Sequence, residues 1–214
     1  MATQLLRRTT AAALIIGYVA LAAAASPAYA KATGDDTVTS TTVKPAAVKN
    51  LPTPKDPTQE TVLIGRTISD GLTLQLELEA AEAMWMPMGK PAKWTAHTPA
   101  KNERYHIEVK ATDNATKTRL PYAVVTFTAT NKDNGKPVKA VLPPMWGSSG
   151  LHYSENSALA GDGIYAATVT VGVPSFAREM KDKDLWSKPV SARFHFRLKD
   201  GALIEVSEPT PELK

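Results

Sequence analysis

The chain has 214 residues, with 25 Lys and Arg against 21 Asp and Glu, and contains no cysteine. The missing cysteine excludes disulfides, cysteine-ligated zinc, iron–sulfur clusters and a thiol nucleophile. A net charge of +4 does not indicate nucleic acid as a partner. Sixteen prolines and a hydrophobic content of 43% favour a turn-rich globular β protein.

The N-terminal residues 1–30 have the pattern of a cleavable signal peptide. Arg7 and Arg8 precede an alanine-rich apolar stretch, and the Ala-Tyr-Ala run at residues 28–30 has the small-x-small form of a cleavage site. An uncleaved membrane anchor is the alternative, but the apolar stretch is short for a span. We therefore expect an exported, soluble protein without membrane insertion after signal cleavage.

Residues 31–60 are rich in Thr, Pro and Lys and poor in large apolar side chains, which predicts a flexible linker. The pattern changes at Thr61. Leucines alternate with polar residues over 72–79, with the period of two of a half-buried strand. The same alternation recurs over 105–111, 125–129, 164–173 and 190–198.

Turn signals separate these runs. Asn134-Gly135 and Asp200-Gly201 each lie between two apolar runs and predict hairpin turns. Short strands at this spacing predict an all-β fold, an immunoglobulin-like antiparallel β-sandwich over residues 61–214.

His106 and Glu108 lie two residues apart on a predicted strand whose other face is apolar. Side chains at this spacing share one face, with Cα atoms about 7 Å apart. Imidazole and carboxylate together suit Fe(II), Mn(II) or Zn(II). The alternative interpretation is an ordinary solvated strand face.

Met145 and His152 lie seven residues apart in a glycine-containing segment that we predict to be a loop. Thioether and imidazole form a soft ligand set that favours copper. Alternatively, Met145 fills a gap in the core and His152 caps the loop.

Met84, Met86 and Met88 fall within five residues, beside proline and glycine. Methionine clusters can bind Cu(I) without the oxidation liability of thiolates. The alternative is an apolar loop lying on the sandwich.

The segment 144–153, with the His-Ile-Glu run at 106–108 upstream, resembles the periplasmic Fe2+-transport protein family over about residues 61–198. These are small iron- and copper-binding proteins found beside bacterial iron permeases. The resemblance implies metal ligation by His106, Glu108, Met145 and His152, with an iron and/or copper ion bound. It also implies an immunoglobulin-like homodimer that delivers iron from the periplasm to an inner-membrane iron permease.

Glu179 stands where the family carries a further histidine, so we expect it as an additional ligand. A carboxylate there would shift the preference towards Fe(II) or Mn(II), whereas Met180 in its place would make the site copper-like. The leading hypothesis is a periplasmic metal-binding protein of an iron-uptake system, not an enzyme. The alternatives are a periplasmic copper chaperone or resistance protein, and a non-metal envelope interaction module.

Overall fold

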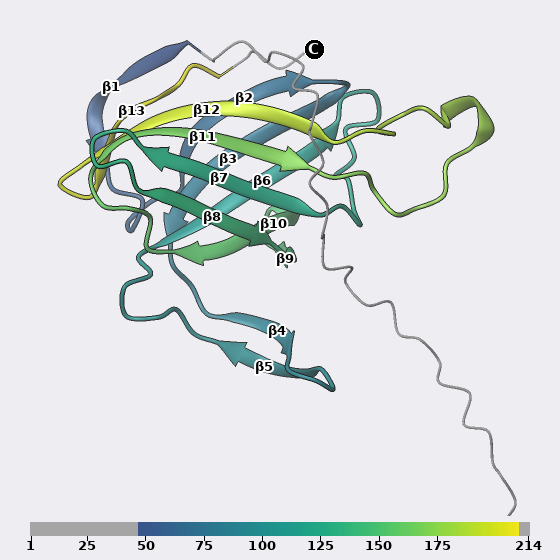
Figure 1. Cartoon of the computed structure of the whole chain (residues 1–214), viewed down its shortest axis with the longest axis horizontal. Coiled ribbons are helices and arrows are strands. Elements are labelled where there is room, and N and C mark those ends of the chain that lie inside the picture. Colours follow the sequence, from purple (N-terminus) through teal and green to yellow (C-terminus); the bar gives the residue numbers. More distant parts are fainter. Residues whose placement is uncertain (1–46, 210–214) are drawn as a thin grey trace, which may run out of the picture. The chain divides into compact units, whose positions relative to one another are not determined.

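The computed structural model describes residues 47–209, so the predicted signal peptide at 1–30 lies outside the described residues. Two large antiparallel sheets pack into a sandwich (Figure 1), which confirms the predicted fold class. In this described part, no helix is long and apolar enough to cross a membrane.

The six-stranded sheet has the strand order β1-β13-β12-β11-β7-β8, and every neighbouring pair is antiparallel. Its strands are β1 (Val48–Lys55), β7 (Val125–Asn131), β8 (Pro137–Leu142), β11 (Gly163–Val171), β12 (Val190–Lys199) and β13 (Ala202–Ser207).

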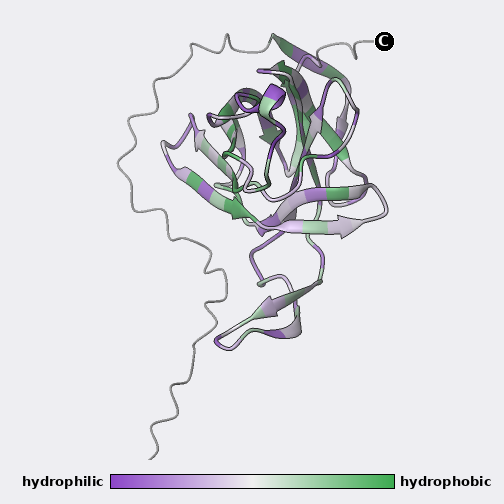
Figure 2. Cartoon of the chain, turned by 90° about the vertical axis from the view of Figure 1, so that its right-hand side faces the viewer, coloured by the Kyte–Doolittle hydropathy of each residue, from purple (hydrophilic) through white to green (hydrophobic). Residues whose placement is uncertain are grey.

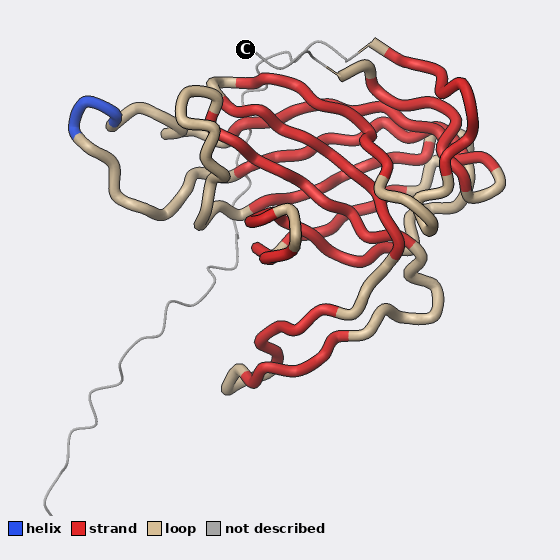
Figure 3. The backbone as a smooth tube through the Cα atoms, turned by 180° about the vertical axis from the view of Figure 1, so that it is seen from behind, coloured by secondary structure: helices blue, strands red, loops and turns tan. Residues whose placement is uncertain are grey.

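The five-stranded sheet has the order β2-β3-β6-β10-β9, and β4 and β5 form a separate hairpin. The strands are β2 (Val62–Ser69), β3 (Leu72–Ala80), β4 (Met84–Met88), β5 (Lys93–His97), β6 (Tyr105–Asp113), β9 (Pro144–Gly147) and β10 (Gly150–Ser157). One 3-10 turn, η1 (Met180–Asp182), lies in the loop between β11 and β12, and Figure 3 shows it in blue.

The alternating apolar runs pack into one core between the two large sheets, and Figure 2 shows the hydrophobic residues in green along the strands. Leu74 and Ile107 from one sheet and Phe127 and Phe196 from the other are fully buried. The period-two pattern predicted this core because successive side chains of a strand point to opposite faces of the sheet.

The predicted linker at 31–60 requires a correction over Val48–Lys55, which form β1 at the edge of the six-stranded sheet. This strand pairs antiparallel with β13. Six of its eight residues are exposed, so its sequence lacks the alternation that marks a half-buried strand. The strand is ordered by main-chain pairing with β13, and Leu51 packs against the core.

The two predicted hairpin turns are confirmed. Asn134-Gly135 lies between β7 and β8, and Asp200-Gly201 joins β12 to β13. Asp200 and Gly201 have φ values of 53° and 77°. Two consecutive positive φ values characterise the type I′ turn, whose twist matches that of the flanking strands.

Candidate metal site

Polar side chains of β3, β6 and β10 occupy the face of the five-stranded sheet that points away from the core. His106 lies directly between Glu79 and Asn156 in register, and Glu108 lies between Glu77 and Ser154. The alternation along β6 predicted this shared face correctly. It follows that acids, amides and imidazoles gather in neighbouring rows of one sheet face.

Burial distinguishes this face from an ordinary solvated one. Relative exposure is 0% for His106 and 4% for both Glu108 and His152. Charged side chains are almost never buried this fully unless they are paired. The solvated-face interpretation of His106 and Glu108 is therefore wrong.

Met145 and His152 lie on a β-hairpin, where the sequence predicted a loop. β9 and β10 are joined through Ser148 and Ser149, so that Met145 and His152 face each other across the two strands. The seven-residue spacing on a two-residue turn produces this pairing. The Ser154 hydroxyl donates to Sδ of Met145 at 3.2 Å.

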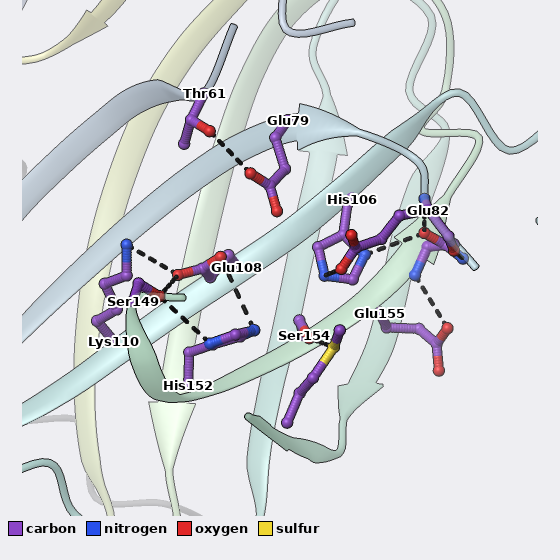
Figure 4. A network of polar contacts seen from close by, with 12 residues as sticks. Thr61, Glu79, Glu82, His106, Glu108, Lys110, Ser149, His152, Ser154 and Glu155 are labelled. Atoms are coloured by element: carbon purple, nitrogen blue, oxygen red, sulfur yellow. Dashed lines mark hydrogen bonds and ion pairs between the residues drawn. The ribbon is translucent and has the colours of Figure 1, made fainter. Parts of the chain in front are cut away.

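Glu108 is the centre of a polar network that includes His152 (Figure 4). Its Oε1 lies 2.8 Å from Nζ of Lys110 and accepts a hydrogen bond from Ser149 Oγ at 3.2 Å. Its Oε2 lies 3.9 Å from Nε2 of His152. Nδ1 of His152 contacts the Gly150 carbonyl at 2.9 Å and must donate there, so Nε2 of the neutral ring keeps its lone pair.

A glycine next to the turn leaves room for this imidazole. A Cβ at Gly147 would come 3.0 Å from Cε1 of His152. The ring orientation therefore depends on the absence of a side chain at residue 147.

Lys110 sets the charge state of the site. Burial alone would raise the pKa of Glu108, but the hydrogen bond and charge of Lys110, with the hydrogen bond from Ser149, hold this pKa below its usual value. Burial alone would lower the pKa of Lys110, but its hydrogen bonds to Glu108 and Glu77 raise it. Glu108 is therefore ionised at neutral pH, as a metal ligand must be.

His106 faces a different carboxylate. Its Nδ1 lies 3.0 Å from Oδ1 of Asn156, and its Nε2 lies 3.8 Å from Oε1 of Glu82. Nε2 is buried and has no hydrogen-bond partner. The ligand atoms of Glu79, Glu82 and His106 all lie within 4.8 Å of one another.

Glu79 and Glu82 are not among the ligands predicted from the sequence. Glu79 had a usable signal, because it is polar on a predicted strand and pairs in register with His106. Glu82 follows β3 in an irregular segment, where no pattern predicts its direction.

The structure does not bring Glu179 to the other predicted ligands within one chain. Glu179 lies between β11 and β12 in the loop that carries η1 (Figure 3), and its side chain is 75% exposed. It forms an ion pair with Lys181 at 3.1 Å. Met180 is also exposed, at 82%.

These features define a class: an antiparallel β-sandwich protein whose outer sheet face presents imidazole, carboxylate and thioether donors. The model of the family described as Fe2+ transport protein matches residues 70–199. The chain belongs to this family.

Other known proteins resemble this chain, some in sequence and some in fold. UPF0423 proteins of Brucella abortus and Brucella suis are each 36% identical over 115 residues, which is 46% of this chain and 63% of the relative. The match thus spans less than two thirds of these relatives. FetP of uropathogenic E. coli strain F11 superposes with a TM-score of 0.54 and 22% identity, covering 65% of this chain and 96% of FetP. A copper-bound variant of P19 from Campylobacter jejuni gives a TM-score of 0.53 and 20% identity, with 65% and 98% covered.

Proposed function

We propose that this protein is a periplasmic metal-binding protein of an iron-uptake system. It binds iron, and also copper, and hands the ion to an inner-membrane permease without catalysing covalent chemistry. The ligands are His106, Glu108, Met145 and His152, with Glu179 contributed by a second copy.

The observation that carries this proposal is the state of the two buried histidines. Each uses Nδ1 for a hydrogen bond to a fixed oxygen, on Asn156 for His106 and on Gly150 for His152. Each turns Nε2 towards a carboxylate at 3.8–3.9 Å, beyond hydrogen-bonding distance. Imidazoles held in this way are ready metal ligands, because the bond at one nitrogen fixes the tautomer and orientation of the other.

The donor set fits the metals of the family and of its structural neighbours. Carboxylate and imidazole suit Fe(II), and the thioether of Met145 adds affinity for copper. The family description names Fe2+ transport, and FetP and P19 variants have been solved with copper. These likenesses support iron and copper as the ions of this chain.

Glu179 supports a homodimer in the proposal. It is exposed in the loop that carries η1, and from there it joins the site of a second copy in this proposal. Its carboxylate would then make the completed site harder and favour Fe(II).

Metal analysis and anaerobic titration test this function. Purified protein should bind stoichiometric Mn2+, a redox-stable substitute for Fe2+, and copper. Replacing His106 by Ala should weaken the binding of both ions at least tenfold, and Met145→Leu should weaken copper binding most. The matched control is His195→Ala, which removes an imidazole paired with Glu205 on the other sheet. Absence of stoichiometric metal would overturn the proposal in favour of an interaction module.

A second candidate function, copper chaperoning, is favoured by the β4–β5 hairpin. Met84, Met86 and Met88 alternate along β4 and so share one face of it, and His97 lies opposite Met84. Three thioethers and an imidazole on one face are a soft set suited to Cu(I).

Cu(I) titration of Met86→Leu/Met88→Leu separates the two functions. A loss of at least tenfold in Cu(I) affinity, with Mn2+ binding unchanged, would favour copper chaperoning. Trp85→Leu is the control, because Trp85 is exposed on the opposite face of the same strand.

A further inference from the structure

We propose that Glu79, Glu82 and Nε2 of His106 form a second cation position, of hard ligand character, on the same sheet face. The inference deepens the proposed function and rests on it, because both positions use His106. Its single free nitrogen binds one ion at a time, so the two positions are alternatives for this histidine. Figure 4 shows His106 beside Glu82, and His152 beside Glu108. Glu79 and Glu82 lie outside the three motifs that indicated metal binding in the sequence.

Asn156 fixes the tautomer of His106. Its Nδ2 donates to the Glu82 carbonyl at 2.9 Å, and its Oδ1 accepts from the Glu82 backbone N–H at 3.2 Å. The amide cannot flip without losing both bonds, so Oδ1 must face Nδ1 of His106 as an acceptor. The proton of the neutral imidazole is therefore on Nδ1, and Nε2 carries the lone pair.

The lone pair on Nε2 faces a carboxylate beyond hydrogen-bonding distance. Nε2 is buried, makes no hydrogen bond, and lies 3.8 Å from Oε1 of Glu82. Two lone pairs that face each other at this distance repel, and a cation bound between them removes the repulsion. Two ligand atoms bound to one such ion at about 2.1 Å lie about 3–4 Å apart. The separation of His106 and Glu82 fits a shared ion.

The His195–Glu205 pair on the other sheet provides the internal comparison. There Nε2 and Oε2 approach to 3.2 Å and form a hydrogen bond. An imidazole and a carboxylate that pair directly thus close to hydrogen-bonding distance in this protein. His106 and Glu82 do not, although His106 is the more buried imidazole.

Glu79 supplies the third ligand atom from the neighbouring strand. It lies directly opposite His106 in register, and its Oε2 accepts a hydrogen bond from the Thr61 hydroxyl at 2.8 Å. This bond orients the carboxylate in the way that outer hydrogen bonds orient metal ligands. The side chain of Glu82 is 45% exposed, so an ion can reach the position from solvent.

The donor chemistry selects the ion. Two carboxylates and one imidazole suit Fe(II), Mn(II) or Zn(II), whereas Cu(I) prefers the thioether of Met145. The sheet face would thus hold two positions that differ in softness, one at Glu79, Glu82 and His106 and one around Met145 and His152.

The test is an anaerobic Mn2+ titration of the full chain carrying Glu79→Gln and Glu82→Gln. We expect Mn2+ affinity to fall at least tenfold while copper affinity stays within twofold of wild type. Met145→Leu should give the opposite pattern. Glu60→Gln is the control, since Glu60 is a similarly exposed carboxylate paired with Lys55.

Two results of this titration overturn the inference, and they are distinguishable. If the double variant binds Mn2+ within twofold of wild type while Met145→Leu still loses copper, the second position does not exist and the proposed function stands. If wild-type protein binds neither ion, both proposals fail. Circular dichroism verifies that each variant is folded.

Long-range proton–nitrogen NMR of the histidine rings tests the role of Asn156 as a positioning residue. Metal-free protein should show His106 as the Nδ1–H tautomer, with its Nε2 signal shifting when Zn2+ is added. Asn156→Ala should move the ring towards the Nε2–H tautomer and weaken Mn2+ binding. An Nε2–H tautomer in the metal-free wild type would contradict the inference.

Discussion

At the scale of single residues, Lys110 allows two carboxylates to lie buried on one sheet face. Glu77 and Glu108 are directly opposite in register, and like charges in that position repel. The ammonium group of Lys110 contacts both of them. The polar face is therefore neutralised internally in part, and Lys110 keeps Glu108 ionised.

Replacing Lys110 by Met should lower the free energy of unfolding by about 2–4 kcal/mol, because removing one partner leaves buried charge uncompensated. Urea unfolding at pH 7 measures this. Lys139→Met on β8 is the control and should change little, since Lys139 is exposed. Equal effects of the two substitutions would show that Lys110 does not stabilise the face.

Glu205 provides a pH-dependent contribution remote from the metal site. Its hydrogen bond from His195, together with that from Arg197, holds the pKa of Glu205 below the ordinary value of 4.5. A depressed pKa in the folded state adds stability above the ordinary value, and this stability is lost as pH falls through the folded pKa. Glu205→Gln should thus be less stable than wild type at pH 6, with a difference that shrinks below about pH 4.5. Urea midpoints from pH 3 to pH 6 measure it, and a constant difference would contradict the assignment.

At the scale of elements, the hairpin formed by β9 and β10 places Met145 and His152, seven residues apart in sequence, opposite each other in space. In the sequence, Met145 and His152 are marked only by their residue types and spacing. Only the strand pairing puts them face to face. Strand pairing also decides the structure of β1. Its exposed side chains show no alternation, but its main chain pairs with β13 and completes the six-stranded sheet.

Shortening the chain tests the role of β1. A chain that begins at Ala47 should keep the stability of the sandwich, while one that begins at Asp56 should lose about 1–3 kcal/mol through missing main-chain hydrogen bonds. The second chain should also self-associate, because the edge of β13 becomes exposed. Urea unfolding and sedimentation measure both effects. Equal stability of the two chains would restore the linker interpretation of residues 48–55.

At the scale of the whole molecule, Glu179 connects the proposed site to assembly. A protein with His152→Ala and one with Glu179→Ala each lack one ligand. If Glu179 acts in the site of the second copy, each mixed dimer should regain one complete site of its two. Random exchange makes about half of the dimers mixed, so about a quarter of the full copper capacity should return. Copper titration of the mixture measures the capacity. No recovery despite subunit exchange would remove Glu179 from the ligand set.

The sequence by itself determined the alternating core strands and the shared face of His106 and Glu108. The leucine run at 72–79 and the alternation around His106 and Glu108 predicted both, because the side-chain period of a strand is fixed by backbone geometry. The residue types and spacing of Met145 and His152 marked them as candidate ligands, and the family resemblance implied the same role. These features are local, and local residue order is sufficient to specify them.

The tertiary structure decided burial, register and orientation. Whether His106 faces solvent or is buried depends on neighbouring segments, and the direction of its Nε2 depends on Asn156, fifty residues away in sequence. The convergence of Glu82 on His106 comes from an irregular segment after β3, where no periodicity applies. These properties arise from contacts between distant parts of the chain, which a pattern read along one strand cannot contain.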